Sequence, residues 1–159
     1  MPVRTYLSPE ELQTAVAKIA PVTASFDNLP VHIAITDVHA NVLYANKEAM
    51  KKTGYLDAAE VLGHNPGDLW GGQMDEAFFT QMWQTIKVEK KPFAGKLKNI
   101  RKDGAEYWVV LQIQPIFDKQ NELAYFFAIE PEVSQGSLTN DDVQRAIASF
   151  QTFVKSLAV

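Results

Sequence analysis

The feature that most restricts the fold is a pair of extended stretches near the end of the chain that are apolar on both faces. In residues 107–116 and again in residues 123–130, aromatic and aliphatic side chains occupy both odd-numbered and even-numbered positions. An antiparallel sheet with one solvated face would alternate apolar with polar residues. We therefore predict a sheet covered on both faces. Either the N-terminal helix or a second copy of the chain covers the outer face.

The remaining pattern predicts the other strands and the helices between them. The sequence order indicates an α+β fold: a five-stranded antiparallel sheet, helices gathered over one face, and flanking N- and C-terminal helices. Residues 65–72 have little helical character. The other expected strands are 31–36, 42–45 and 93–101, and the expected helices are 8–20, 46–53, 57–63, 75–87 and 139–157.

Local signals mark the ends of several helices. Ser8 and Glu11 form a capping box, and Pro21 is expected to end the first helix. Asn46 is a suitable N-cap, and Gly54 is a suitable end for the same helix.

The last helix is expected to be capped by Thr139 after a turn at residues 134–137. Its apolar residues are spaced for about two heptads, which leaves a docking helix and a coiled coil both open. We divide the chain into a flanking segment (1–25), a central domain (26–133) and a C-terminal signalling or docking helix (134–159).

Composition excludes several classes of function. The 159 residues include no cysteine, which excludes disulfides and cysteinyl metal sites, and the net charge of −4 is opposite to that of nucleic-acid-binding proteins. No apolar run is long enough for a membrane span, and the N-terminus has no signal-peptide core, so we expect a cytoplasmic protein. The three histidines are scattered, which argues against a metal or haem, and hydrolase and P-loop motifs are missing. We expect no enzymatic activity.

Seven short motifs follow one another in the central segment. They are residues 35–37, 40–46, 53–55, 61–66, 99–104, 107–108 and 115–118. In this order they resemble the motifs of a PAS sensor domain, and together they cover about residues 26–133. The resemblance implies the PAS fold and a ligand pocket between the helices and the inner face of the sheet.

Within that family, residues 77–83 and 91–95 are similar to the FAD-binding PAS domains of aerotaxis transducers and of NifL-type redox sensors. This likeness implies a flavin cofactor and places Asn99 and Trp83 at its pocket. The light-sensing LOV branch differs: Pro66 stands where its adduct-forming cysteine would be, and Gly67 replaces its phosphate-binding arginine. The resemblance therefore implies FAD rather than FMN, without a cysteinyl photocycle.

Asn99 and Glu130 are the polar candidates for contact with a ligand. Asn99 alternates with Phe93 and Leu97, so its amide should point into the core, where it contacts a flavin edge or is satisfied by backbone. Glu130 and Val109 stand where LOV domains have a ring-binding glutamine and a second asparagine. If Val109 and Leu111 face the cavity, the Glu130 carboxyl would have a raised pKa and could exchange a proton with the flavin. The alternative is a solvated glutamate at a strand end.

Three further residues have two interpretations each. Trp83 lies on an apolar helix stripe and is either core or pocket wall. Trp70, in a loop, could wall the pocket or cover an adenine. Asn65 caps a turn or contacts the ring.

The sequence thus predicts a sensory module that binds a flavin, with FAD preferred, and reports its redox or light state through flanking helices. The expected partners are a second copy, packed through the outer sheet face and N-terminal helix, and a downstream signalling domain. The alternative is a cofactor-free interaction module that dimerises through the outer face around Trp108 and Phe127 and could hold a small apolar metabolite.

Overall fold

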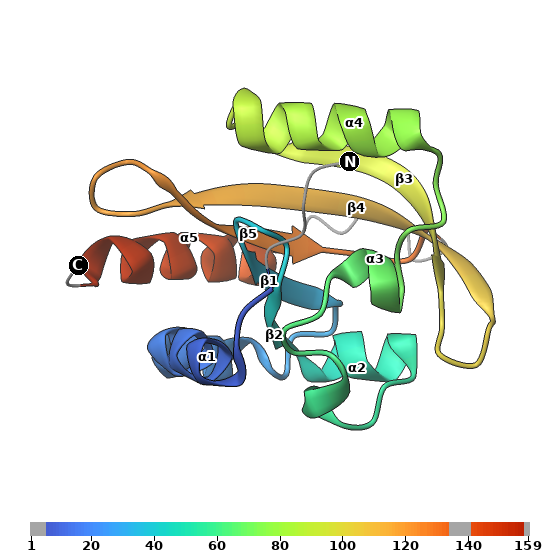
Figure 1. Ribbon diagram of the computed structural model, residues 1–159, viewed down its shortest axis with the longest axis horizontal. Helices are drawn as coiled ribbons and strands as arrows, with labels where there is room; N and C mark the ends of the chain where they lie inside the picture. The colour runs from blue at the N-terminus through green and yellow to red at the C-terminus, as the bar shows by residue number, and fades with distance from the viewer. Residues whose placement is uncertain (1–5, 134–140, 158–159) are drawn as a thin grey trace.

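A five-stranded antiparallel sheet with the order β2-β1-β5-β4-β3 forms the centre of the computed structural model, which describes residues 6–133 and 141–157 (Figure 1). The predicted α+β class and all five strands are confirmed. The Asp103-Gly104 turn joins the two longest strands, and Gly104 adopts the positive φ of 94° that such turns favour. The strands are β1 (Ile33–Asp37), β2 (Val42–Ala45), β3 (Phe93–Ile100), β4 (Glu106–Phe117) and β5 (Leu123–Ile129).

The helical segments between β2 and β3 cover the inner face of the sheet (Figure 1). They are α2 (Lys47–Thr53), η2 (Ala58–Glu60), α3 (Pro66–Leu69), α4 (Glu76–Trp83) and η3 (Gln84–Val88). Three expectations need correction here. The helix expected over 57–63 is only the single 3-10 turn η2, which ends at Glu60. The stretch 65–72 contains the one-turn helix α3, and the helix expected over 75–87 changes at Gln84 from an α-helix to a π-helical turn.

The inner face carries two neighbouring apolar clusters. Under α4 and η3, Met82 and Ile86 pack on Leu97, Val109 and Leu111. Nearer to β1 and β2, a smaller cluster is formed by Ala34, Val42, Val61 and Trp70. The polar candidates for ligand contact lie at the inner face that these clusters share.

The outer face is covered in part by the chain itself, through α1 (Pro9–Thr23), η1 (Ala24–Phe26) and α5 (Asp141–Ser156). Phe150 of α5 is fully buried, and its ring lies 5.4 Å from Tyr125, 5.9 Å from Phe127 and 6.5 Å from Phe26. Over this part of the sheet the cover is therefore α1 and α5 together. On the β3–β4 part, Trp108 keeps 49% of its surface exposed.

The helix ends follow the sequence signals with one exception. The capping box of Ser8 and Glu11 is present, Asn46 caps α2, and Gly54 ends that helix with φ 84°. Pro21 was expected to end the first helix, but α1 continues to Thr23 because the ring blocks only the bond to the residue one turn earlier. The expected cap Thr139 and the turn at 134–137 lie outside the described residues.

Candidate functional site

Four segments that are far apart in the sequence meet at the carboxylate of Glu130. Oε1 accepts a hydrogen bond from Asn99 Nδ2 at 3.0 Å, and Oε2 accepts one from Trp70 Nε1 at 3.1 Å. His32 Nε2 lies 2.9 Å from Oε2, but its N–H is not aligned on that oxygen, so this contact is mainly an ion pair. All four side chains are buried. The structure thus brings Asn99, Glu130 and Trp70 together and adds His32.

Each side chain is held by regular backbone structure. The Glu130 amide donates to the His32 carbonyl at 3.0 Å, which extends the β1–β5 ladder by one residue. Asn99 lies on the inner face of β3, where strand alternation predicts it. The Trp70 carbonyl accepts from the Ile100 amide at 2.8 Å, which ties the end of α3 to the end of β3.

The charge environment of Glu130 differs from the hypothesis made from the sequence. Burial alone would raise the pKa of the carboxyl, but the charge of His32 and the hydrogen bonds from Asn99 and Trp70 outweigh it and lower the pKa below its usual value. The expectation of a raised pKa was therefore wrong. That expectation considered only the apolar neighbours of Glu130 and not the polar side chains that contact its carboxylate.

Several buried polar atoms in this network have no hydrogen-bond partner among the residues the structure describes. They are Asn99 Oδ1, Tyr107 Oη and both ring nitrogens of His32. Burial and the charge of Glu130 raise the pKa of Tyr107 to about 12, so its hydroxyl keeps its proton at neutral pH. Buried polar groups are normally paired. Because the Asn99 side chain also interacts with the Tyr107 hydroxyl, Asn99 Oδ1 is the acceptor of this network left without a partner among the described residues.

The apolar candidates lie beside this network in the cluster under α4. Val109 is fully buried, and Leu111 is nearly so. Trp83 is partly buried: its ring lies 6.0 Å from Phe126, with Lys87 Nζ 4.6 Å from the ring centre. These contacts fit both interpretations of Trp83, as core and as pocket wall.

Asn65 has a different position. Its Oδ1 accepts a hydrogen bond from the Gly67 amide at 2.8 Å and caps α3, which supports the capping interpretation. Contact between Asn65 and a ligand stays a prediction. His32 was missed by sequence reasoning, although it alternates with Ala34 and Thr36 in a buried strand and therefore needed a polar partner.

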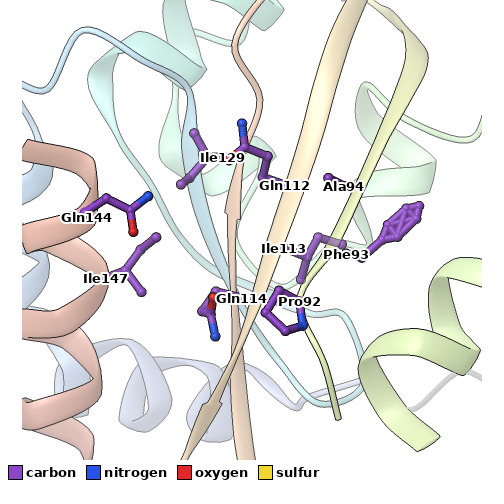
Figure 2. A pocket seen from close by; sticks show the side chains of 9 residues that line it. All are labelled: Pro92, Phe93, Ala94, Gln112, Ile113, Gln114, Ile129, Gln144 and Ile147. Carbon is purple, nitrogen blue, oxygen red and sulfur yellow. The ribbon is translucent and has the colours of Figure 1, made fainter. Parts of the chain in front are cut away.

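A separate groove of about 180 Å³ lies between α5 and strands β3, β4 and β5 (Figure 2). Three glutamine side chains, Gln112, Gln114 and Gln144, surround it together with Ile129 and Ile147. None of the predicted ligand residues lines this groove. Within the described ranges, no group of three or more acidic, histidine or cysteine side chains could hold a metal ion. No helix there is both long and apolar enough to cross a membrane.

Comparison with known proteins identifies the family. A sequence model described as "PAS domain" matches residues 30–135, about two thirds of the chain. The chain belongs to the PAS domain family. The PAS sensor resemblance seen in its motifs is thereby confirmed.

Two relatives and one solved structure illustrate the neighbours of this PAS domain. The nitrogen fixation regulatory protein of Klebsiella oxytoca is 36% identical over 104 residues, which are 65% of this chain and 21% of that protein. Rice phototropin-2 is 34% identical over 94 residues, which are 59% of this chain and 10% of that protein. A solved RNA-binding light-oxygen-voltage receptor has a TM-score of 0.65 at 21% identity, over 96% of this chain and 39% of that one. The PAS domain thus spans about a fifth or less of the length of these curated relatives.

Proposed function

We propose that this PAS domain binds a flavin against the inner face of its sheet and signals the redox or light state of that flavin. The observation that carries the proposal is the buried Asn99 Oδ1, which has no partner among the described residues and lies with the Tyr107 hydroxyl beside the Glu130 carboxylate. The pyrimidine edge of a flavin alternates an N–H donor with carbonyl acceptors. An amide oxygen and a phenolic hydroxyl complement such an edge.

The surroundings support a planar guest. Val109 and Leu111 supply apolar contacts on β4, and Trp83 supplies an aromatic one on α4. FAD is preferred to FMN because Gly67 and Pro66 offer no charge for a terminal phosphate at the start of α3. A bound flavin supplies the electron chemistry. The residues of the chain bind and orient it, with the ionised Glu130 carboxylate held beside it by Asn99 and Trp70.

The route for the signal follows strand β5. Glu130 and Phe126 point to the inner face, whereas Phe127 and Ile129 belong to the outer cluster with α1 and α5. A shift of Glu130 upon a change in the flavin would therefore alter the packing of α5. In this proposal residues 26–133 form the sensing domain. The segments 1–25 and 134–159 carry the signal to a second copy or a downstream domain, in the cytoplasm and without catalysis by this domain.

A second candidate function is a cofactor-free interaction module. Trp70 favours it, because this indole is 1% exposed, fills interior volume next to Glu130 and already occupies Oε2. In this reading the inner face is a packed core that holds at most a small apolar metabolite, and the domain acts through its surfaces.

The absorption spectrum of the purified chain, mixed with FAD, FMN or riboflavin and desalted, distinguishes the two. We expect bound flavin bands near ~370 and ~450 nm, retained most strongly with FAD. Asn99→Leu should lose the colour, whereas the matched control Asn28→Leu, at an exposed loop position, should keep it. A colourless wild type after all three mixtures would refute flavin binding and leave the interaction module.

A further inference from the structure

His32 is the buried ionisable group that the proposed flavin contacts leave unused. It is 2% exposed and follows Val31 directly before β1, in a segment whose other buried residues are mostly apolar. An imidazole in such a place is costly to bury unless it is paired. Its partner here is the Glu130 carboxylate at 2.9 Å.

The backbone fixes this pair. His32 and Glu130 are opposite each other on neighbouring strands, joined by the hydrogen bond from the Glu130 amide to the His32 carbonyl. Both side chains project from the inner face, as do Ala34 and Ala128, the next pair along the ladder. The His32 ring is also held edge-on to Trp70, with ring centres 4.9 Å apart.

The other side chains that face Glu130 are uncharged at neutral pH, so His32 is the neighbour that can balance the carboxylate charge. From β3 and α3 come the neutral donors Asn99 and Trp70, and from β4 comes Tyr107, whose hydroxyl is uncharged at neutral pH. Farther out, beyond Tyr107, Arg101 Nη2 lies 3.2 Å and Lys52 Nζ 3.4 Å from Glu132 Oε1. The groups that lower the pKa of Glu130 are His32, Asn99 and Trp70, and neither of these cations is among them.

We infer that His32 is a positioning residue that keeps Glu130 ionised and neutralises its charge, so that the ligand site can accept an anionic form of its ligand. The identity of the ligand in this inference rests on the proposed function. The role of His32 rests on its ion pair with Glu130. With His32 as the imidazolium, the pair has no net charge. Without it, the site presents a single carboxylate that either takes up a proton or repels an anion.

The first experiment uses the ligand-free chain and does not depend on flavin. The side-chain carboxyl carbon of glutamate is labelled, and the Glu130 NMR signal is identified by its loss in Glu130→Gln. In His32→Gln, the pH at which Glu130 protonates should rise by at least about one unit. His39→Gln, at an exposed histidine, should leave it unchanged. An unchanged titration in His32→Gln would overturn the inference.

Should His32→Gln fail to fold, His32→Asn is titrated in the same way. An unchanged Glu130 protonation in that variant would equally overturn the inference.

The second experiment tests the effect on a ligand. Reduction of a flavin by dithionite adds two electrons and one or two protons, and with one proton the reduced ring is an anion. In FAD-loaded His32→Gln, affinity for reduced relative to oxidised flavin should fall about tenfold, which equals about 30 mV for a two-electron couple. In His32→Gln/Glu130→Gln both charges are gone, and the potential should return toward the wild-type value.

The outcomes separate the two proposals. If neither the wild type nor any variant binds flavin, the proposed function fails. The titration of the Glu130 carboxyl still decides whether His32 is its partner. If flavin binds and His32→Gln has the wild-type potential at every pH, the inference fails while flavin binding stands.

Discussion

At the scale of single residues, Glu130 shows how donors can reverse the effect of burial. Its carboxylate has lost nearly all its water, yet it is approached by an amide, an indole and an imidazole. The charge of His32 and two hydrogen-bond donors in a low-dielectric interior stabilise the charged form more than burial destabilises it, which explains the lowered pKa.

This lowered pKa predicts the effect of acid on stability. Because the folded pKa lies below the ordinary value of 4.5, the stabilisation is complete above that value and is lost as pH falls through the folded pKa. Glu130→Gln should lower the free energy of unfolding by about 1–3 kcal/mol at pH 7, and this gap should shrink below pH ~4.5. Urea denaturation across pH measures it, with the exposed Glu122→Gln as control. A gap that stays constant down to low pH would contradict the ion pair.

Trp70 gives a second prediction at this scale. Trp70→Phe removes the Nε1 donor of Glu130 and leaves a small cavity, so we expect a loss of about 2–4 kcal/mol in the free energy of unfolding. Trp108→Phe makes the same change at a half-exposed site and should lose less than about 1 kcal/mol. Equal losses, measured by urea denaturation, would show that the buried hydrogen bond contributes nothing.

The polar site could be predicted from the sequence only in part. Strand alternation is a local property, and it placed Asn99 on the inner face correctly. The meeting of His32 and Trp70 at Glu130 depends on how β1, α3 and β5 assemble, which no local spacing encodes. The motif resemblance supplied Asn99 and Glu130, but it carried no information on their hydrogen bond to each other or on the approach of His32 and Trp70 to Glu130.

At the scale of elements, Asn46 combines a helix cap with a link between segments. Its Oδ1 accepts from the Ala49 amide in α2 and from the Ile33 amide in β1, both at 3.0 Å. Its Nδ2 donates to the carbonyl of Val31 at 2.8 Å and to that of Phe26 at 3.2 Å. The cap was predictable from the sequence pattern. The tertiary bonds were not, because they join residues up to 20 positions apart.

Asn46→Ala should therefore cost more than the loss of an ordinary cap. We expect about 2–4 kcal/mol lower stability, since buried amide and carbonyl groups on three segments lose their partner. Asn65→Ala removes the cap of the one-turn helix α3, whose described bond is a single exposed one, and should cost about 1 kcal/mol or less. Thermal and urea unfolding of both variants test this. Similar losses would mean that the links of Asn46 to β1 and η1 are unimportant.

At the scale of the whole molecule, the double-sided apolar pattern of β4 and β5 predicted a sheet with two covered faces, and the structure confirms that the outer face has a cover. The sequence could not decide which segment covers it, because a helix that docks on its own sheet and a helix that forms a coiled coil have the same amphipathic pattern. The structure shows α5 docked through Phe150 and Val154, with α1 beside it. Phe127 is consequently enclosed by its own chain and unavailable to a second copy.

What remains for a second copy is the β3–β4 part of the outer face. Trp108 is half-exposed there and lies opposite Lys98 on the neighbouring strand, outside the cover of α1 and α5. We predict that the chain dimerises through this surface, since burying an exposed indole is among the most favourable contributions an interface can gain. Trp108→Glu should then raise the dimer dissociation constant at least about tenfold in sedimentation velocity. Val88→Glu replaces another exposed apolar side chain, on η3 away from this surface, and should leave it unchanged. Equal sedimentation of wild type and Trp108→Glu at every concentration would show that any association uses a different surface.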